Sequence, residues 1–288
     1  MRLPRRNYQE QVDSYFDSRS SYWAEIYNAR SVEGVIYQQR MAMVLEWTDH
    51  LALPKRSRIL EVGCGAGLTT IELARHGYVV DAIDSSEIMV ERARSSVIAS
   101  SVEDQVKVFR GDVNSLAFED DAFALVLAVG VIPWLESPGP AVREMARVAK
   151  PGGCVITTSD NFMGLNYLID PLRNPALAPV RGLLKRTLET AGLRKPRVES
   201  GLVHMHTTSY IDRVILQNRL EIEKSSTLGF GPFSFLGSTL FPESVGIRLH
   251  HRLQALAHRG VAGLRSTGSQ YLLLARKRQS PVANGALL

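Results

Sequence analysis

Closely spaced glycines near position 65 are the feature of this sequence that could do chemistry. Gly63, Gly65 and Gly67 alternate with small residues in the run EVGCGAG, which starts at Glu61. Glycine lets the backbone approach a ligand that a Cβ atom would exclude, and a helix that follows such a turn offers unpaired amide groups. A dinucleotide site would place a further glycine at Leu68, so the pattern here is a different one.

Two acidic residues follow at later points of the same region. Asp84 ends the apolar run YVVDAID, and its carboxylate suits the two hydroxyl groups of a ribose. Asp81 lies in the same run but faces the opposite side, because side chains alternate along a strand. Asp112 ends the run QVKVFRGD, where it could accept a hydrogen bond from an exocyclic amino group. The glycine turn, together with Asp84 and Asp112, predicts a nucleoside-binding site.

Alternating strand and helix patterns begin at Arg58 and would position these residues. Strands are expected at 58–64, 78–84, 105–112, 123–132 and 154–159, with helices at 68–77, 86–99 and 141–150 between them. A further helix at 208–219 and strands at 220–229 and 268–278 complete the series. This order predicts an α/β fold, a Rossmann-like doubly wound seven-stranded sheet with N-terminal helices and an inserted helical cap.

The chain divides into segments that differ in pattern. We expect an N-terminal helical lid at 1–52, the Rossmann-like core at 53–160, a cap insertion at 161–205, and a return to the core at 206–279 with a second insertion at 230–262. Residues 280–288 are expected to be a flexible tail. The second insertion contains an amphipathic helix whose apolar stripe is Val245, Leu249, Leu253 and Leu256.

The motifs resemble those of class I S-adenosylmethionine-dependent methyltransferases. EVGCGAG corresponds to their glycine motif, Asp84 to the ribose acid, Gly111-Asp112 to the adenine-side pair, and KPGG to the turn before the fifth strand. The segment from Tyr15 to Arg40 is similar to the N-terminal helices of quinone and tetrapyrrole methyltransferases, whose aromatic residues cover the cofactor.

The resemblance implies S-adenosyl-L-methionine as the cofactor. The glycine turn would hold its methionyl part, Glu61 its amino group, Asp84 its ribose, and Asp112 with Val113 its adenine. The cofactor-binding residues expected in this way are Glu61, Gly63, Gly65, Gly67, Asp84, Ser85, Met89, Asp112, Val113, Tyr22, Tyr27 and Arg40. The aromatic residues among them could equally serve to pack the N-terminal helices on the core.

The catalytic residues are less clearly marked. Methyl transfer requires a base only where the acceptor must lose a proton. Relatives in this family often carry a histidine after the fourth strand, where this chain has Val-Ile-Pro-Trp at 131–134. Asp160, His204 and His206 are the candidates for contact with the acceptor, and the alternatives are a turn-capping aspartate and structural histidines. A metal site is not expected, because two histidines lack further spaced ligands.

The charge of the chain is divided between its halves. Residues 1–160 carry 17 Lys and Arg against 22 Asp and Glu, whereas residues 161–288 carry 17 against 7, and the whole chain has a net charge of +5. An acidic first half argues against a uniformly basic surface for nucleic acid. Basic residues beside the apolar stripe of the second insertion could meet an anionic membrane surface, close over an apolar acceptor, or simply be solvated.

These observations predict a cytoplasmic methyltransferase of biosynthesis that acts on O, C or N of a small hydrophobic or amphipathic metabolite. One alternative is an enzyme for lipid or quinone acceptors that is peripheral to the inner face of the membrane. Another is a non-catalytic scaffold that binds S-adenosylmethionine. Nucleic acid is not expected as a partner, and the sequence leaves the acceptor and the oligomeric state open.

Overall fold

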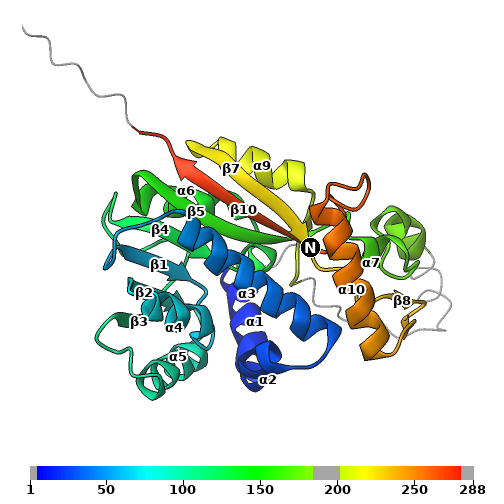
Figure 1. Ribbon diagram of the computed structural model, residues 1–288, viewed down its shortest axis with the longest axis horizontal. Helices are drawn as coiled ribbons and strands as arrows, with labels where there is room; N and C mark the ends of the chain where they lie inside the picture. The colour runs from blue at the N-terminus through cyan, green and yellow to red at the C-terminus, as the bar shows by residue number, and fades with distance from the viewer. Residues whose placement is uncertain (1–4, 184–201, 280–288) are drawn as a thin grey trace, which may run out of the picture.

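A mostly parallel sheet runs through the middle of the computed structural model, which describes residues 5–183 and 202–279 (Figure 1). Its strands lie in the order β3-β2-β1-β4-β5-β10-β7. Strands β1 to β5 are parallel, and β10 is antiparallel to both of its neighbours. The strands are β1 (Arg58–Val62), β2 (Val79–Asp84), β3 (Val106–Arg110), β4 (Phe123–Ala128), β5 (Ala149–Asn161), β7 (Leu220–Leu228) and β10 (Gln270–Lys277). This sheet confirms the expected Rossmann-like fold.

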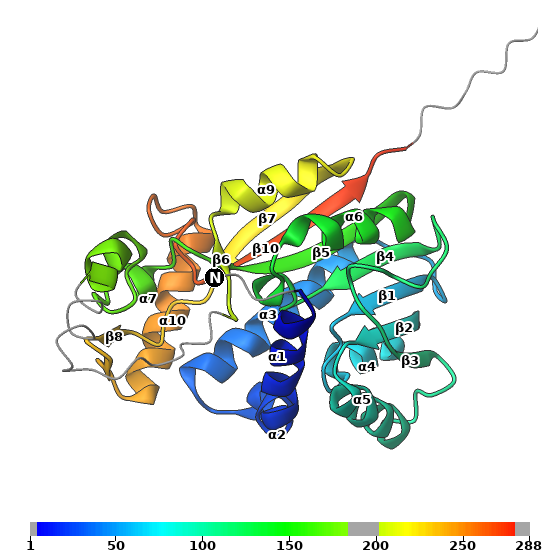
Figure 2. The same ribbon diagram turned by 180° about the vertical axis from the view of Figure 1, so that it is seen from behind.

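Helices cover both faces of the sheet, as the views from front and back show (Figures 1 and 2). One face packs against α3 (Val32–His50), α4 (Leu68–Arg75) and α5 (Glu87–Ala99). The other packs against α6 (Pro138–Val148) and α9 (Thr208–Leu216). Strand β4 is apolar on both faces, as a central parallel strand should be. Within the described residues, no helix is long and apolar enough to cross a membrane.

The N-terminal helices stand over the carboxyl edge of the sheet. They are α1 (Arg5–Ser18) and α2 (Ser20–Glu25), followed by a short 3-10 turn, η1 (Ile26–Asn28), and the long α3. Helix α3 begins at a side-chain cap, because the Ser31 hydroxyl accepts a hydrogen bond from the Gly34 amide at 3.1 Å. From there α3 runs along the sheet and buries Val44 and Trp47 in its core.

The expected cap insertion is described only in part. After β5 the chain forms α7 (Leu165–Leu168) and the 3-10 turn η3 (Pro175–Leu177), and it returns at β6 (Met205–His206), which pairs with the end of β5. Residues 184–201 and the expected tail at 280–288 lie outside the described residues. A 3-10 turn, η2 (Ile132–Trp134), follows β4.

The second insertion forms a two-stranded hairpin, β8 (Ser234–Phe235) with β9 (Ser238–Thr239), and helix α10 (Glu243–His258). Leu249 and Leu253 of the expected stripe pack on Phe230 and Phe233, but Leu256 is exposed. Leu249 and Leu253 of the stripe therefore serve the core of the protein.

The most deeply buried face of α10 is polar. The His250 ring accepts a hydrogen bond from the Phe230 amide at Nδ1, which leaves Nε2 to donate to the Gln39 side chain at 2.9 Å. Gln254 accepts from the Gly229 amide and donates to the Thr227 carbonyl. Helix α10 thus satisfies backbone groups of the segment that follows β7, and burial lowers the pKa of His250 to about 4.

Replacing His250 should make stability less dependent on pH. The ring is neutral in the folded chain, so its contribution is present above its ordinary pKa of 6.5 and is lost as the pH falls through about 4. We expect His250→Leu to lower the free energy of unfolding at pH 7 by about 1–3 kcal/mol, because two buried partners lose a hydrogen bond.

Urea unfolding at a series of pH values between 7 and 4 measures both effects. His251→Leu alters the exposed histidine next along the helix and should change the pH dependence little. An unchanged slope between pH 6.5 and 4 in His250→Leu would contradict the assignment of a neutral buried ring.

Candidate active site

The glycine turn joins β1 to α4 at the carboxyl edge of the sheet. Gly65 has a φ of +53°, a conformation that suits glycine, and a Cβ atom built on it would meet no atom within 4 Å. Gly63 differs, because its Cβ would lie 2.5 Å from the Val131 side chain. Gly67 begins α4 with a φ of +83°. The open space beside Gly65 is part of a cavity of about 630 Å³ that the expected site residues line.

Asp84 ties this turn to the end of β2. Its carboxylate accepts one hydrogen bond from the Gly65 amide at 2.9 Å and another from the Ser86 amide at 3.0 Å. Burial raises the pKa of Asp84, while the hydrogen bonds to Ser86 and Gly65 oppose that effect. Asp81 points away, as its place in the strand predicts, and forms an ion pair with Arg58 at 2.6 Å.

Glu61 lies at the end of β1, almost completely buried. The Thr70 hydroxyl of α4 donates a hydrogen bond to its carboxylate. Burial raises the pKa of Glu61 to about 8, with the Thr70 bond lowering it and the nearby Asp84 raising it. A cationic ligand group at this point of the cavity would stabilise the ionised carboxylate.

Cys64 stands within the turn and does not suit nucleophilic catalysis. Burial, followed by the charges of Asp84 and Glu61, raises the pKa of its thiol well above the ordinary value. The thiol therefore stays protonated at neutral pH.

The remaining expected cofactor residues of the core also line the cavity. Met89 is buried at the start of α5, and Val113 is buried after β3. The Ser85 hydroxyl donates to Asp13 of α1 at 2.7 Å, so α1 is tied to the end of β2. Asp112 stabilises the turn in which it lies, because one oxygen of its carboxylate accepts hydrogen bonds from the backbone amide and the side-chain amide of Asn114. Its second carboxylate oxygen takes no part in those two bonds.

Aromatic rings from the N-terminal helices form one wall of the cavity. The Phe16 ring lies 4.7 Å from that of Trp134, which follows β4, and 5.6 Å from that of Trp23. Tyr15 lies 4.9 Å from Trp134. The sequence motifs did not mark Trp134, although its place after the fourth strand put it at the correct edge.

Tyr22, Tyr27 and Arg40 occupy different depths of the cavity lining. Tyr22 is 41% exposed, and its hydroxyl donates to Glu33 at the rim. Arg40 of α3 is 6% exposed and donates to the Tyr27 hydroxyl at 2.8 Å. Its guanidinium carbon also lies 4.4 Å from the centre of the Tyr37 ring. Arg40 is thus held rigidly beside the cavity.

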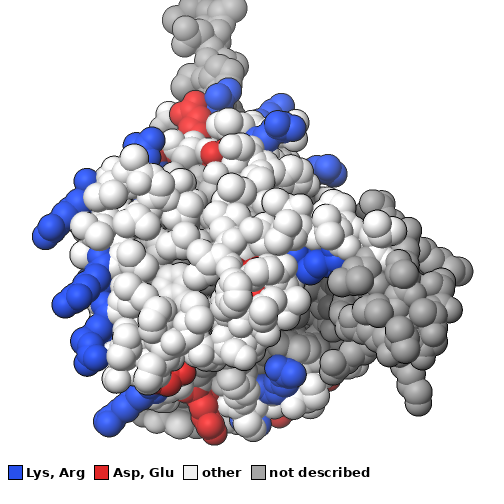
Figure 3. Space-filling model, turned by 90° about the vertical axis from the view of Figure 1, so that its right-hand side faces the viewer, with Lys and Arg blue, Asp and Glu red and all other residues white. Residues whose placement is uncertain are grey.

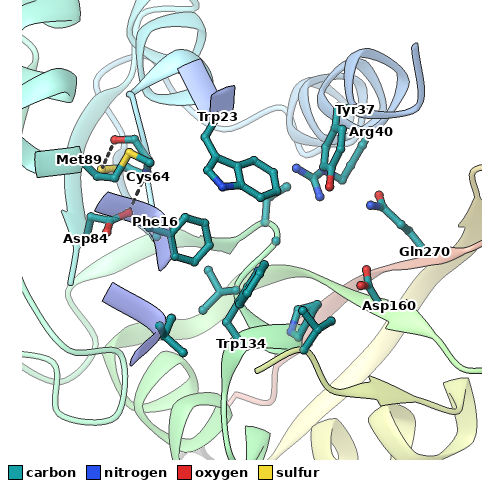
Figure 4. A pocket seen from close by; sticks show the side chains of 18 of the residues that line it. Phe16, Trp23, Tyr37, Arg40, Cys64, Asp84, Met89, Trp134, Asp160 and Gln270 are labelled. Atoms are coloured by element: carbon teal, nitrogen blue, oxygen red, sulfur yellow. Dashed lines mark hydrogen bonds between the residues drawn. The ribbon is translucent and has the colours of Figure 1, made fainter. Parts of the chain in front are cut away.

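The cavity has two ends that differ in character (Figure 4). We call one the glycine-turn end, where Cys64, Asp84 and Met89 lie. The other we call the polar end. Its residues are Tyr37, Arg40, Asp160, Asn166 and Gln270. Phe16, Trp23 and Trp134 lie between the two ends.

Asp160 is the one of the three catalytic candidates that lines the cavity. It ends β5, and burial raises its pKa to about 6, opposed by the positive charge of Arg40. His204 and His206 are not among the cavity-lining residues. Their rings stack 6.5 Å apart, and the His206 ring stacks on Tyr210 at 5.0 Å. No group of three or more His, Cys, Asp or Glu among residues 5–183 and 202–279 could hold a metal ion.

Several residues of the polar end were not found from the sequence. Gln270 lies beside Asp160 because β10 pairs with β5 in that register. Its one visible signal was a polar residue at the head of an apolar strand. Asn166 follows β5 on α7, in a segment without a recognisable pattern, and Tyr167 beside it also lines the cavity.

Comparison with known proteins decides the family. A family model described as a methyltransferase domain matches residues 60–157. The phosphatidylethanolamine N-methyltransferase of Cereibacter sphaeroides is 32% identical over 180 residues, which are 62% of this chain and 78% of that protein. The chain belongs to the class I S-adenosylmethionine-dependent methyltransferases.

Two further similarities agree with this membership. A ubiquinone biosynthesis O-methyltransferase of Alkalilimnicola ehrlichii is 32% identical to this chain. The alignment covers 57% of this chain and 65% of that protein. The solved structure of a magnesium protoporphyrin IX methyltransferase from Synechocystis, with bound S-adenosylhomocysteine, is 17% identical and shares the fold with a TM-score of 0.62. That alignment covers 93% of this chain and 99% of the other.

S-adenosylmethionine is the cofactor of this methyltransferase, and the glycine-turn end fits it. The space beside Gly65 is open where a side chain would fill it, and the Asp84 carboxylate borders that space. Met89 and Val113 offer an apolar lining for a purine ring. The assignment of each residue to a part of the cofactor remains a prediction.

Filling the space at Gly65 should block the cofactor. We expect Gly65→Ala to weaken S-adenosylhomocysteine binding at least tenfold in calorimetry, because the added methyl group enters the cavity. The positive φ adds about 1 kcal/mol of backbone strain.

Gly260→Ala is the matched control. Gly260 also has a positive φ, and its Cβ would likewise meet no atom within 4 Å, but it does not line the cavity. It should lose similar stability and keep full affinity. Equal affinities in the two variants would count against a ligand beside Gly65.

Proposed function

We propose that this enzyme transfers a methyl group to an oxygen, carbon or nitrogen atom of a small hydrophobic or amphipathic acceptor. The observation that carries the proposal is a continuous cavity of about 630 Å³, which joins the glycine-turn end to an aromatic wall and a polar end. A volume of that order suits a small organic molecule beside a nucleoside. The named functions of the phosphatidylethanolamine and ubiquinone relatives support an acceptor with a large apolar part.

The chain's own residues would hold the cofactor at the glycine-turn end. In this proposal the Asp84 carboxylate accepts from the ribose hydroxyls, Asp112 and Val113 contact the adenine, and Glu61 accepts from the amino group. The carboxylate of the cofactor would extend from the glycine-turn end toward Arg40, with Tyr22 and Tyr27 as its other predicted contacts. The carboxylates of the glycine-turn end also suit the positive charge of a sulfonium.

S-adenosylmethionine supplies a methyl group bound to a positively charged sulfur, which is a strong electrophile. The acceptor atom forms the new bond to the methyl carbon as the carbon–sulfur bond breaks, and that bond's electron pair stays on sulfur. What the protein adds is alignment, which can supply about 7 kcal/mol or more. Phe16, Trp23 and Trp134 would confine the acceptor and exclude water.

A labelled methyl donor tests this function directly. We expect the purified enzyme to move label from S-adenosylmethionine into material that organic solvent extracts, when it is incubated with lipid, quinone and polyphenol extracts. Asp84→Ala should lose both the transfer and the binding of S-adenosylhomocysteine in calorimetry. Asp81→Ala, a change of the carboxylate that faces away, should retain both. Absence of cofactor binding to the unaltered protein would overturn the proposal.

A second observation favours a site of action at an anionic membrane surface. The segments around α7, β8–β9 and α10 expose apolar side chains to solvent. We call their common surface the cap face, and its apolar residues are Leu172, Leu177, Val180, Leu183, Phe235, Leu236, Leu240, Phe241, Leu256 and Val261. These segments lie together in both ribbon views (Figures 1 and 2).

Positive charge borders the cap face. Residues 162–183 and 234–265 contain six arginines against two acidic residues. Both acids have partners within the protein: Asp170 accepts from the Ser234 hydroxyl, and Glu243 accepts from the Val32 amide that begins α3. Figure 3 shows this side as a broad uncharged area with Lys and Arg along its edges and some Asp and Glu at its top and bottom. Apolar side chains flanked by arginines fit an anionic lipid surface.

Charge reversal on α10 tests the membrane proposal. The double variant Arg248→Glu with Arg252→Glu should bind vesicles of phosphatidylglycerol and phosphatidylcholine at least tenfold more weakly in sedimentation, because each basic residue near the surface contributes about 1 kcal/mol. Lys107→Glu with Arg143→Glu makes the same charge change on β3 and α6 and should retain binding. Equal loss in both double variants, or none in either, would argue against the cap face as the site of contact.

A further inference from the structure

Buried polar atoms without hydrogen-bond partners gather around the cavity. Within the described residues six such atoms occur, and four of them, Trp23 Nε1, Arg40 Nε, Asn166 Oδ1 and Gln270 Oε1, belong to residues that line the cavity, whereas the Nε2 atoms of His204 and His206 do not. An unpaired buried polar atom is costly, so such atoms are rare in native proteins and require a reason. A bound ligand that pairs with them supplies that reason.

Hydrogen-bond acceptors are concentrated at the polar end. Gln270 is 8% exposed and Asn166 is 4% exposed, so both side chains are held almost entirely within the protein. Asp160 faces Gln270 across the β5–β10 ladder (Figure 4). Burial raises the pKa of Asp160, and only the positive charge of Arg40 opposes that rise. No described residue donates a hydrogen bond to the Asp160 carboxylate. The side-chain oxygens of Asp160, Asn166 and Gln270 are therefore free to accept hydrogen bonds from a ligand.

The charges around these acceptors disfavour a cationic ligand. The Arg40 guanidinium, buried beside Tyr37, interacts with Asp160. Arg173 and Glu33 also line the cavity, so two arginines face two carboxylates in this region and their charges balance. An ammonium group would add an unbalanced positive charge to that of the sulfonium. A neutral hydroxyl group offers a donor without this repulsion, and the arginines would stabilise the negative oxygen formed when it loses its proton.

We infer that the polar end binds a hydroxyl group of the acceptor and that the methyl group is transferred to that oxygen. Asp160 accepts the hydroxyl proton as the oxygen forms its bond to the methyl carbon, and the electron pair of the breaking carbon–sulfur bond stays on sulfur. Gln270 and Asn166 orient the acceptor by accepting through their side-chain oxygens from a second donor group, such as a neighbouring hydroxyl, because one hydroxyl supplies a single hydrogen. The substrate class is a neutral, largely apolar hydroxyl compound, and this inference rests on the function proposed above.

The charge state of Asp160 agrees with this role. Burial raises its pKa to about 6, so the side chain is a carboxylate at neutral pH and can still take up a proton. The groups that face it are Tyr37 and Arg40 from α3 and Tyr167 from α7, while His206 lies on the adjoining strand β6. Burial raises the pKa of both tyrosines, so they stay neutral.

Binding of two probes to the enzyme with S-adenosylhomocysteine tests the inference without any need for turnover. In calorimetry, 4-butylphenol should bind at least tenfold more tightly than 4-butylbenzylamine, which carries an ammonium group at neutral pH. Asp160→Asn should weaken phenol binding about tenfold or more, and Gln270→Leu should weaken the binding of 4-butylcatechol, which carries a second hydroxyl, more than that of 4-butylphenol. In the unaltered enzyme, phenol affinity should fall as the pH is lowered through about 6, and Asp160→Asn should abolish that dependence.

Asp212→Asn is the matched control. It removes a carboxylate that accepts from the Tyr271 hydroxyl on the other face of the same sheet, and it should leave phenol binding unchanged. S-adenosylhomocysteine affinity should be the same in all variants, which shows that the fold and the glycine-turn end are intact. Failure of S-adenosylhomocysteine to bind the unaltered protein would instead refute the proposed function.

Three results would overturn the inference while leaving the proposed function standing. They are the absence of phenol binding to the unaltered enzyme, tighter binding of the ammonium probe, and phenol affinity that is unchanged in Asp160→Asn.

Discussion

The hydrogen bond from the Gly65 amide to the Asp84 carboxylate holds together the part of the structure on which the site depends. It joins the turn after β1 to the end of β2, two points 19 residues apart in the chain. The same carboxylate accepts from the Ser86 amide at the start of α5, so one buried side chain fixes a turn, a strand end and a helix start. The open side of Gly65 can border a cavity because the turn is held in this way.

Much of the glycine-turn end could be predicted because its signals are local. Gly65 and Asp112 follow β1 and β3, Asp84 ends β2, and parallel strands bring their carboxyl ends to one edge of the sheet. The polar end could not be predicted in the same way. Gln270 reaches Asp160 because β10 inserts antiparallel between β5 and β7, and a sequence pattern marks a strand without naming its neighbour.

At two other places the local sequence pattern did not predict the tertiary contacts. His204 directly precedes β6 and His206 lies on it, and their rings stack, but neither residue is part of the cavity lining. In α10 the apolar period was visible, yet His250 and Gln254 are its most deeply buried large side chains. Backbone amides and carbonyls of the neighbouring segment needed partners, and that demand cannot be seen in the helix sequence itself.

The polar contacts beneath α10 separate two properties of the enzyme that might otherwise be linked. Hydrogen bonds through His250 and Gln254 set the position of the backbone at Gly229 and Phe230, next to Gly231 and Pro232 in the cavity lining. Such bonds depend on direction, so the helix cannot slide or rotate without breaking them. The outward side of α10 can therefore exchange its charges and apolar side chains while the inward side keeps the cavity in shape. Where the enzyme resides and what it methylates can then be altered independently of each other.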